Sequence, residues 1–190
     1  MSEYNAPLRD MRFVLDEIAN IEAIKAKNPR LQNLLEIRKQ TNPQDIFKGI
    51  VKNDEHLDLV MCNPPFFSSA QEAQEANLKK VKGLGGKDDT AKPNFRGQSN
   101  ELWCPGGEKR FLSQMVNESK EFADHCFWFT TLVSKSSHLK GLQNSLDYHK
   151  AEEVRVINMS QGNKSSRILA WTFLSKEQQK EWRSKRWGKE

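Results

Sequence analysis

The most chemically distinctive residues of this sequence are Asn63-Pro64-Pro65-Phe66, which follow an apolar run. An amino group conjugated to a ring is a poor nucleophile because its lone pair is delocalised, so an enzyme that methylates it has to hold both N–H groups and the ring. The Asn63 side-chain oxygen can accept one hydrogen and the Pro64 carbonyl the other, while Phe66 stacks on the ring. The two prolines fix φ at about −65° and stiffen the segment. The motif therefore predicts methyl transfer to an amino group, with all four residues catalytic.

The motif defines the reaction better than it defines the substrate. Adenine, cytosine and a glutamine side chain all present an NH2 conjugated to a π system, so RNA, DNA adenine and a protein glutamine stay open as substrates. An ordinary strand end is the structural alternative, because Pro-Pro breaks a strand ladder and Asn is frequent in turns. The position of Asn63 directly after the run 57–62 favours the catalytic interpretation.

Basic residues after this motif indicate contact with a nucleic-acid backbone. Segment 77–107 is rich in Gly, Lys and polar residues, and we expect it to be a long functional loop. A solvated surface loop would have a similar composition. The predicted substrate-binding residues are Phe67, packed beneath the catalytic loop, and the basic residues Lys79, Lys82, Lys87, Lys164 and Arg167.

The C-terminal tail combines basic residues with Trp182 and Trp187. Basic side chains interleaved with indoles suit neutralisation of phosphates together with base stacking. The alternative is a terminal helix that packs on the sheet, and we expect this packing role for Trp182.

Alternating helices and strands have to position these residues. We expect helices at 18–28 and 108–123, a helix or turn at 44–52, strands at 34–38, 57–62 and 127–133, and an antiparallel pair at 153–159 and 169–174. This order is typical of a mostly parallel α/β sheet that an antiparallel edge closes. A strand at 57–62 would deliver Asn63 to the carboxyl edge of the sheet, where open α/β sheets bind ligands.

The composition suits a single globular core. The chain has 190 residues, of which 36% are hydrophobic and 29% charged, with a net charge of +5 and a mean hydropathy of −0.79. Since no run approaches the roughly 20 apolar residues of a membrane span and no secretory signal is recognisable, we expect a cytoplasmic monomer without membrane contact. The three cysteines are widely spaced, which argues against a disulfide framework, and the four scattered histidines suggest no metal site.

Six collinear blocks form a recognisable set at 45–50, 62–66, 101–108, 127–135, 161–167 and 170–173. Together they resemble the bacterial large-subunit ribosomal RNA adenine-N6 methyltransferases (RlmF-like). The resemblance implies a Rossmann-like class I methyltransferase sheet, S-adenosyl-L-methionine as cofactor and 23S rRNA as RNA partner. The implied activity is that of a 23S rRNA (adenine(1618)-N6)-methyltransferase, which acts in rRNA processing. Block 101–108 is peculiar to this rRNA family, which argues against a DNA or glutamine substrate.

The sequence departs from that family at its beginning. Full-length members carry a Gly-rich strand-turn-helix for the cofactor there, whereas the first glycine here is Gly49, so no cofactor-binding residue is assigned. Residues 4–15 are instead similar to the opening of acyl-CoA dehydrogenases, or form an amphipathic helix. We therefore expect an atypical leader at 1–19 and a partial methyltransferase domain at 20–190, with an inserted basic loop at 77–107. Such an N-terminally truncated sheet, missing its first strand-turn-helix, makes an inactive, rRNA-binding remnant the alternative to an active enzyme.

Overall fold

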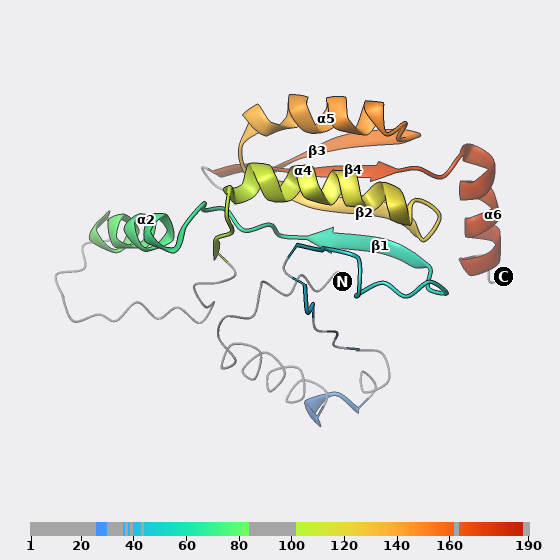
Figure 1. The fold of residues 1–190 in the computed structure, drawn as a ribbon, viewed down its shortest axis with the longest axis horizontal. Helices are drawn as coiled ribbons and strands as arrows, with labels where there is room; N and C mark the ends of the chain where they lie inside the picture. Colours follow the sequence, from blue (N-terminus) through green and yellow to red (C-terminus); the bar gives the residue numbers. More distant parts are fainter. Residues whose placement is uncertain are drawn as a thin grey trace.

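The computed structural model describes residues 26–29, 36, 38, 40–42, 44–83, 102–161 and 164–187. These residues form a four-stranded sheet with the strand order β1-β2-β4-β3 (Figure 1). β1 and β2 are parallel, whereas β4 is antiparallel to both β2 and β3. The predicted α/β sheet with an antiparallel edge pair is confirmed. The strands are β1 (Leu57–Cys62), β2 (Cys126–Val133), β3 (Glu153–Gln161) and β4 (Lys164–Thr172).

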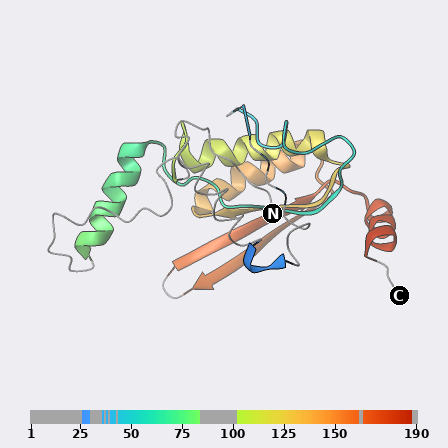
Figure 2. The same cartoon turned by 90° about the horizontal axis from the view of Figure 1, so that it is seen from below.

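Helices α4 and α5 lie together on one face of the sheet (Figure 2). Helices α2 and α6 lie beyond opposite ends of the strands (Figure 1). None of the helices in the described ranges has the length and apolar character needed to cross a membrane. The helices are α2 (Ala70–Gly83), α4 (Gly107–Ser119), α5 (Leu139–Tyr148) and α6 (Lys176–Arg186), with 3₁₀ turns η2 (Lys120–Phe122) and η3 (Ser136–His138).

The main core lies between the sheet and helices α4 and α5. Successive strand residues point to opposite faces, so Phe129 and Val133 of β2 both enter this core. Trp171 of β4 is fully buried, and its ring stacks with that of Phe129 at a centroid distance of 5.7 Å. Trp171 Nε1 also donates to Ser119 Oγ at 3.0 Å, which satisfies the indole inside the core. Helix α4 contributes an apolar stripe that consists of Phe111, Leu112, Met115 and Val116.

The opposite face of the sheet keeps several large apolar side chains exposed. Leu59 and Met61 of β1 are 44% and 53% exposed, and Ile157 and Met159 of β3 are 48% and 39% exposed. The strand register places Leu59 beside Trp128, which is half-buried. We call these exposed residues, Leu59, Met61, Ile157 and Met159, the open face.

A buried carboxylate joins α4 to the segment before β1. Glu118 is 7% exposed, and its oxygens accept hydrogen bonds from the backbone N–H groups of Ile46, Phe47 and Lys48 at 2.7–3.0 Å. Successive N–H groups that converge on one anion form a nest. Because these amides point to Glu118, the segment 44–52 forms turns, which confirms the second of the two forms expected for it.

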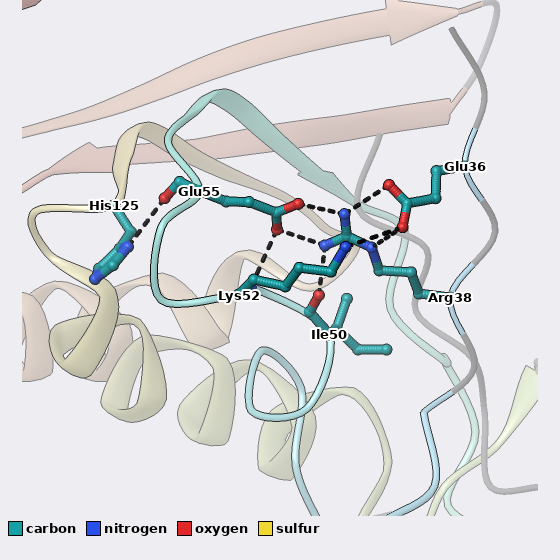
Figure 3. A network of polar contacts seen from close by, with 6 residues as sticks. All are labelled: Glu36, Arg38, Ile50, Lys52, Glu55 and His125. Atoms are coloured by element: carbon teal, nitrogen blue, oxygen red, sulfur yellow. Dashed lines mark hydrogen bonds and ion pairs between the residues drawn. The ribbon is translucent and has the colours of Figure 1, made fainter. Parts of the chain in front are cut away.

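Figure 3 shows a second polar cluster, which ties this segment to the starts of β1 and β2. The Arg38 guanidinium pairs with the carboxylates of Glu36 and Glu55. The hydrogen bonds from Arg38 lower the pKa of Glu55 to about 2. The Glu55 carbonyl oxygen lies 3.0 Å from His125 Nδ1, and Leu57 N–H donates to the His125 carbonyl at 2.7 Å. These contacts fix the entry to β1 beside the entry to β2.

The structure corrects the loop expected at 77–107. Helix α2 continues to Gly83, so residues 77–83 are helical. Its start carries an N-terminal capping pattern, since Ser69 Oγ accepts from Glu72 N–H at 3.2 Å and the Glu72 carboxylate accepts from Ser68 N–H at 2.8 Å. Ala, Gln, Glu and Lys then sustain the helix by propensity, without an apolar stripe. Residues 84–101 lie outside the described residues, so the rest of the inserted loop stays an expectation.

The hairpin of β3 and β4 also differs from the expected pair. β4 begins at Lys164, five residues before the strand predicted from 169, and pairs with β3 out to Gln161. The residues from Lys164 to Arg167 are therefore in a strand that the sequence predicted only from 169. Their polar composition is overridden by cross-strand pairing with β3, because strand preference depends strongly on neighbouring strands.

Two further elements were not anticipated correctly. Helix α5 was not predicted, and the strand expected at 34–38 is wrong for Glu36 and Arg38, which belong to no strand. Their side chains pair with each other and with the loop before β1, so Glu36 and Arg38 are held beside that loop. The leader at 1–19 lies outside the described residues.

Candidate functional site

The Asn63–Phe66 loop begins at the carboxyl end of β1 (Figure 1). Cys62, the last residue of β1, is buried in the core. The chain then leaves the sheet, because Pro64 and Pro65 have no N–H to donate to a strand ladder. Both prolines are buried, Phe66 is half-buried and Asn63 is exposed. The fold therefore presents Asn63 at the sheet edge where open α/β sheets bind ligands.

Backbone hydrogen bonds from the segment before α4 hold the loop in place. The N–H groups of Phe66 and Phe67 both donate to the Leu102 carbonyl, at 3.0 and 2.9 Å. Cys104 N–H donates to the Phe67 carbonyl at 3.0 Å, and Phe67 forms an isolated parallel bridge with Trp103. The loop is thus stiffened by its own prolines and by this short strand-like pairing. A ring and an amide held in this way are oriented before a substrate arrives.

Gly106 and Gly107 make the turn that brings the segment against the loop. Their φ angles are +83° and +61°, a region that glycine adopts more readily than other residues. A Cβ on Gly107 would lie 3.4 Å from the Ser68 nitrogen and 3.5 Å from the Phe67 carbonyl carbon, so backbone packs directly on backbone there. A Cβ on Gly106 would come within 2.7 Å of the Arg110 side chain. The positive φ angles are therefore what requires glycine in this turn, because a Cβ on Gly107 would only reach van der Waals contact with the loop.

Of the predicted basic residues, Arg167 lies at the same sheet edge as the loop. β4 pairs Arg167 with Val133, and β1 pairs Cys62 with Thr131, two residues earlier in the same strand β2. Asn63, which directly follows β1, and Arg167 of β4 therefore lie at the same end of the strands, with β2 between β1 and β4. Arg167 is half-buried.

The other predicted basic side chains are not described, whereas Phe67 directly follows the loop. Lys79 and Lys82 belong to the last turns of α2, and Lys164 is the first residue of β4. The structure does not describe the side chains of these three residues. Lys87 lies in the undescribed segment 84–101. Phe67 is half-buried and forms the bridge to the segment before α4. Substrate contacts by these residues stay predictions.

The basic tail lies at the opposite end of the sheet from the loop (Figure 1). Asp58, the second residue of β1, accepts hydrogen bonds from Trp182 Nε1 at 2.7 Å, Trp187 Nε1 at 3.0 Å and Arg186 Nε at 2.9 Å. Trp182 is 8% exposed and packs edge-on against Phe127. The packing role expected for Trp182 is confirmed, and Trp187 and Arg186 share in docking α6.

We expect the docking of α6 to weaken in acid. The hydrogen bonds from Arg186, and then those from Trp182 and Trp187, lower the pKa of Asp58 from its ordinary value of 3.8. A carboxyl group with a depressed pKa in the folded state contributes stability that is present above its unfolded pKa and is lost as the pH falls through its folded pKa. Tryptophan emission should therefore shift to the red below about pH 4. Asp58→Asn should abolish this transition, and an unchanged acid transition in that variant would contradict the assignment.

Residues 13–175 match a family model described as RNA methyltransferase. The chain belongs to this RNA methyltransferase family. It is similar to the ribosomal RNA large subunit methyltransferase F of Yersinia enterocolitica, with 48% identity over 166 residues, and to that of Cytophaga hutchinsonii, with 48% identity over 171 residues. These stretches cover 86% and 90% of this chain but 50% and 53% of the two relatives. The chain thus spans about half the length of the curated relatives it matches.

Solved structures show which fold this family member has. It is similar to the hMettl16 catalytic domain in complex with MAT2A 3′UTR hairpin 1, with a TM-score of 0.57 and 21% identity over 80% of this chain and 50% of that one. The N-terminal domain of human METTL16 in complex with SAH gives a TM-score of 0.55 at 19% identity, over 88% of this chain and 50% of that one. The sheet is therefore of the class I methyltransferase type, as predicted.

Trp103 is a candidate site residue of this RNA methyltransferase family member that the sequence analysis did not single out. It is half-buried beside Phe67, and its Nε1 atom is buried without a hydrogen-bond partner among the described residues. A buried unpaired donor destabilises a protein by about 1–3 kcal/mol, so a ligand acceptor placed there would be bound favourably. The available signal was its place within block 101–108.

Proposed function

We propose that this chain carries the amine-binding part of an S-adenosyl-L-methionine-dependent 23S rRNA (adenine-N6)-methyltransferase. The RNA methyltransferase family and the names of the two relatives support an rRNA substrate. The position and rigidity of the Asn63–Phe66 loop support chemistry on an amino group.

The observation that carries this proposal is a pair of hydrogen-bond acceptors at the sheet edge that are unpaired among the described residues. Neither the Asn63 side chain nor the Pro64 carbonyl has a hydrogen-bond partner among the described residues. An adenine N6 amine has two hydrogens and therefore needs two acceptors. With both hydrogens held, the nitrogen lone pair is directed away from the loop. The N6 proton leaves only after the nitrogen has gained the methyl group and become cationic, so the site needs acceptors and no strong base.

Phe66 supplies the third contact of the proposed adenine site. An adenine inside an RNA helix is stacked on its neighbouring bases, so it has to leave this stack before its N6 amine can reach Asn63. Stacking on an aromatic side chain contributes about 1–3 kcal/mol per base, which offsets part of this unstacking. The hydrogen bond from Phe66 N–H to the Leu102 carbonyl fixes the backbone from which this ring extends.

S-adenosyl-L-methionine supplies an electrophilic methyl group when bound, but the described residues do not form a cradle for it. A Rossmann-like sheet holds such a cofactor on a glycine turn that directly follows a strand. The described glycines with positive φ are Gly49, Gly106 and Gly107, and none of them directly follows a strand. Gly107 packs on the backbone of Phe67 instead. We assign no cofactor-binding residue.

Two measurements on the purified chain 1–190 test the proposed function. The first is calorimetric titration with S-adenosyl-L-methionine into the millimolar range. The second is mass spectrometry of nucleosides from unmethylated 23S rRNA after incubation with the chain and cofactor. If the chain binds the cofactor, we expect it to form N6-methyladenosine in the rRNA. Saturable cofactor binding by a folded chain that leaves the rRNA unmethylated would overturn the proposal.

A non-catalytic RNA-binding protein is the second candidate, and the lack of a cofactor cradle among the described residues favours it. Its signature would be retention of 23S rRNA on a filter together with no calorimetric response to the cofactor. Calorimetry therefore separates a chain that cannot load the methyl donor from one that loads it and uses another substrate.

A further inference from the structure

Glu108 is a fully buried carboxylate directly after the Gly106-Gly107 turn. It is 2% exposed and lies in the first turn of α4. A carboxylate is expensive to bury unless it is paired or hydrogen-bonded, and a helix N-terminus favours a negative charge. An apolar residue would fill the same space without this cost, so the contacts of Glu108 indicate what the carboxylate does.

The partners of Glu108 all lie at the carboxyl end of β2. Its Oε1 accepts from Ser134 N–H at 2.7 Å and its Oε2 accepts from Ser134 Oγ at 2.8 Å. Ser134 is the first residue after β2, and β2 is the strand that pairs with β1. Oε2 also lies 2.9 Å from His138 Nδ1, at ion-pair distance but outside hydrogen-bond alignment. One side chain thus fixes the start of α4 to the sheet edge that carries the loop.

The backbone beside Glu108 continues this connection to the loop. Gly107 packs against the Phe67 and Ser68 backbones, and its N–H donates to the Cys104 carbonyl at 2.8 Å. Cys104 N–H in turn donates to the Phe67 carbonyl. A contiguous path therefore runs from the end of β2 through Glu108 and the glycine turn to the residue after Phe66.

We propose that Glu108 is a positioning residue for the Asn63–Phe66 loop. It holds the glycine turn against Phe67 and thereby fixes the positions of the Phe66 ring and the Asn63 amide relative to each other. The catalytic consequence rests on the proposed function, whereas the effect on the loop itself does not.

Hydrogen–deuterium exchange, resolved by residue, tests this role without requiring catalysis. Glu108→Gln keeps the size of the side chain but leaves one acceptor oxygen in place of two, so only one of the two Ser134 donors keeps its acceptor. We expect exchange at the Phe66, Phe67 and Cys104 amides to become at least about tenfold faster relative to the Phe129 amide in β2, because the loop opens locally. If the chain methylates rRNA, kcat should fall while the Kd for rRNA stays nearly constant.

Glu118→Gln is the matched control. Glu118 is the other buried glutamate of α4, and it binds backbone amides at the opposite end of the helix. This variant should speed exchange at Ile46 and Phe47 and leave the ratio of Phe66 to Phe129 exchange unchanged. The proposal is overturned if both variants change that ratio equally, or if Glu108→Gln leaves it unchanged.

A milder variant covers the case in which Glu108→Gln does not fold. Ser134→Ala removes the Oγ bond and leaves the carboxylate and the backbone bond in place. Its Phe66 and Phe67 amides should exchange faster than those of the wild type, by a smaller factor than in Glu108→Gln. Wild-type exchange at both amides in Ser134→Ala would count against the positioning role. A failure of the wild type and of every variant to methylate rRNA would count against the proposed function alone.

Discussion

Asn63→Ala is expected to lower the rate of N6 methylation of 23S rRNA by about 10²–10³-fold, the range found when one preorganised hydrogen-bonding group is removed from an active site. The Asn63 side chain is exposed at the end of β1, and in the proposed function it supplies one of the two acceptors for the amine. Its removal leaves the backbone path of the loop intact, since Phe66 and Phe67 stay bonded to Leu102. The rRNA affinity should therefore change little, and the KM for rRNA should stay near its wild-type value.

Asn144→Ala is the control for this experiment. Asn144 is an exposed residue of α5, on the helix layer and away from the loop. Methylation and filter-binding affinity should both match the wild type in this variant. A parallel loss of methylation and rRNA affinity in Asn63→Ala would show that the residue serves general RNA binding, which contradicts the assigned role.

Glu118→Ala is expected to reduce the free energy of unfolding by about 3 kcal/mol or more. The substitution leaves the backbone N–H groups of Ile46, Phe47 and Lys48 without their acceptor, and each unsatisfied buried donor destabilises by about 1–3 kcal/mol. Urea denaturation followed by far-UV circular dichroism measures the change. Glu121→Ala is the matched control, because Glu121 is exposed and, among the described residues, forms its ion pair with Lys48 at the surface, where such pairs contribute at most about 1 kcal/mol. An equal change in the free energy of unfolding in the two variants would contradict the stabilising role of the amide nest around Glu118.

The strand β1 and the position of the Asn63–Phe66 loop at its end could be predicted because their signals are local. The run Leu57–Cys62 ends at two prolines, which cannot continue a ladder, so the sequence itself places Asn63 at a strand end. The apolar stripe of α4 and the antiparallel pair β3 and β4 were accessible for the same reason, since side-chain periodicity follows from local geometry.

The rest could not be predicted because it depends on contacts between distant residues. Glu118 and its amide partner Ile46 are 72 residues apart, and Glu108 and Ser134 are 26 apart. In the sequence both glutamates look like ordinary polar positions of a surface helix, and only the fold shows them buried. The extension of β4 to Lys164 likewise depends on β3 as a partner. Helix α2 is the exception, because its Ser69 and Glu72 capping pattern was present in the sequence and was not used.

The open face has a practical consequence for work with the isolated chain. Leu59 and Met61 lie on one outer strand of the described sheet and Ile157 and Met159 on the other, so apolar side chains are exposed along both outer strands. Patches of this kind favour association between molecules. Sulfate and phosphate strengthen apolar burial, whereas urea weakens it. We therefore expect the solubility of the isolated chain in calorimetry buffers to depend on this surface as well as on the net positive charge.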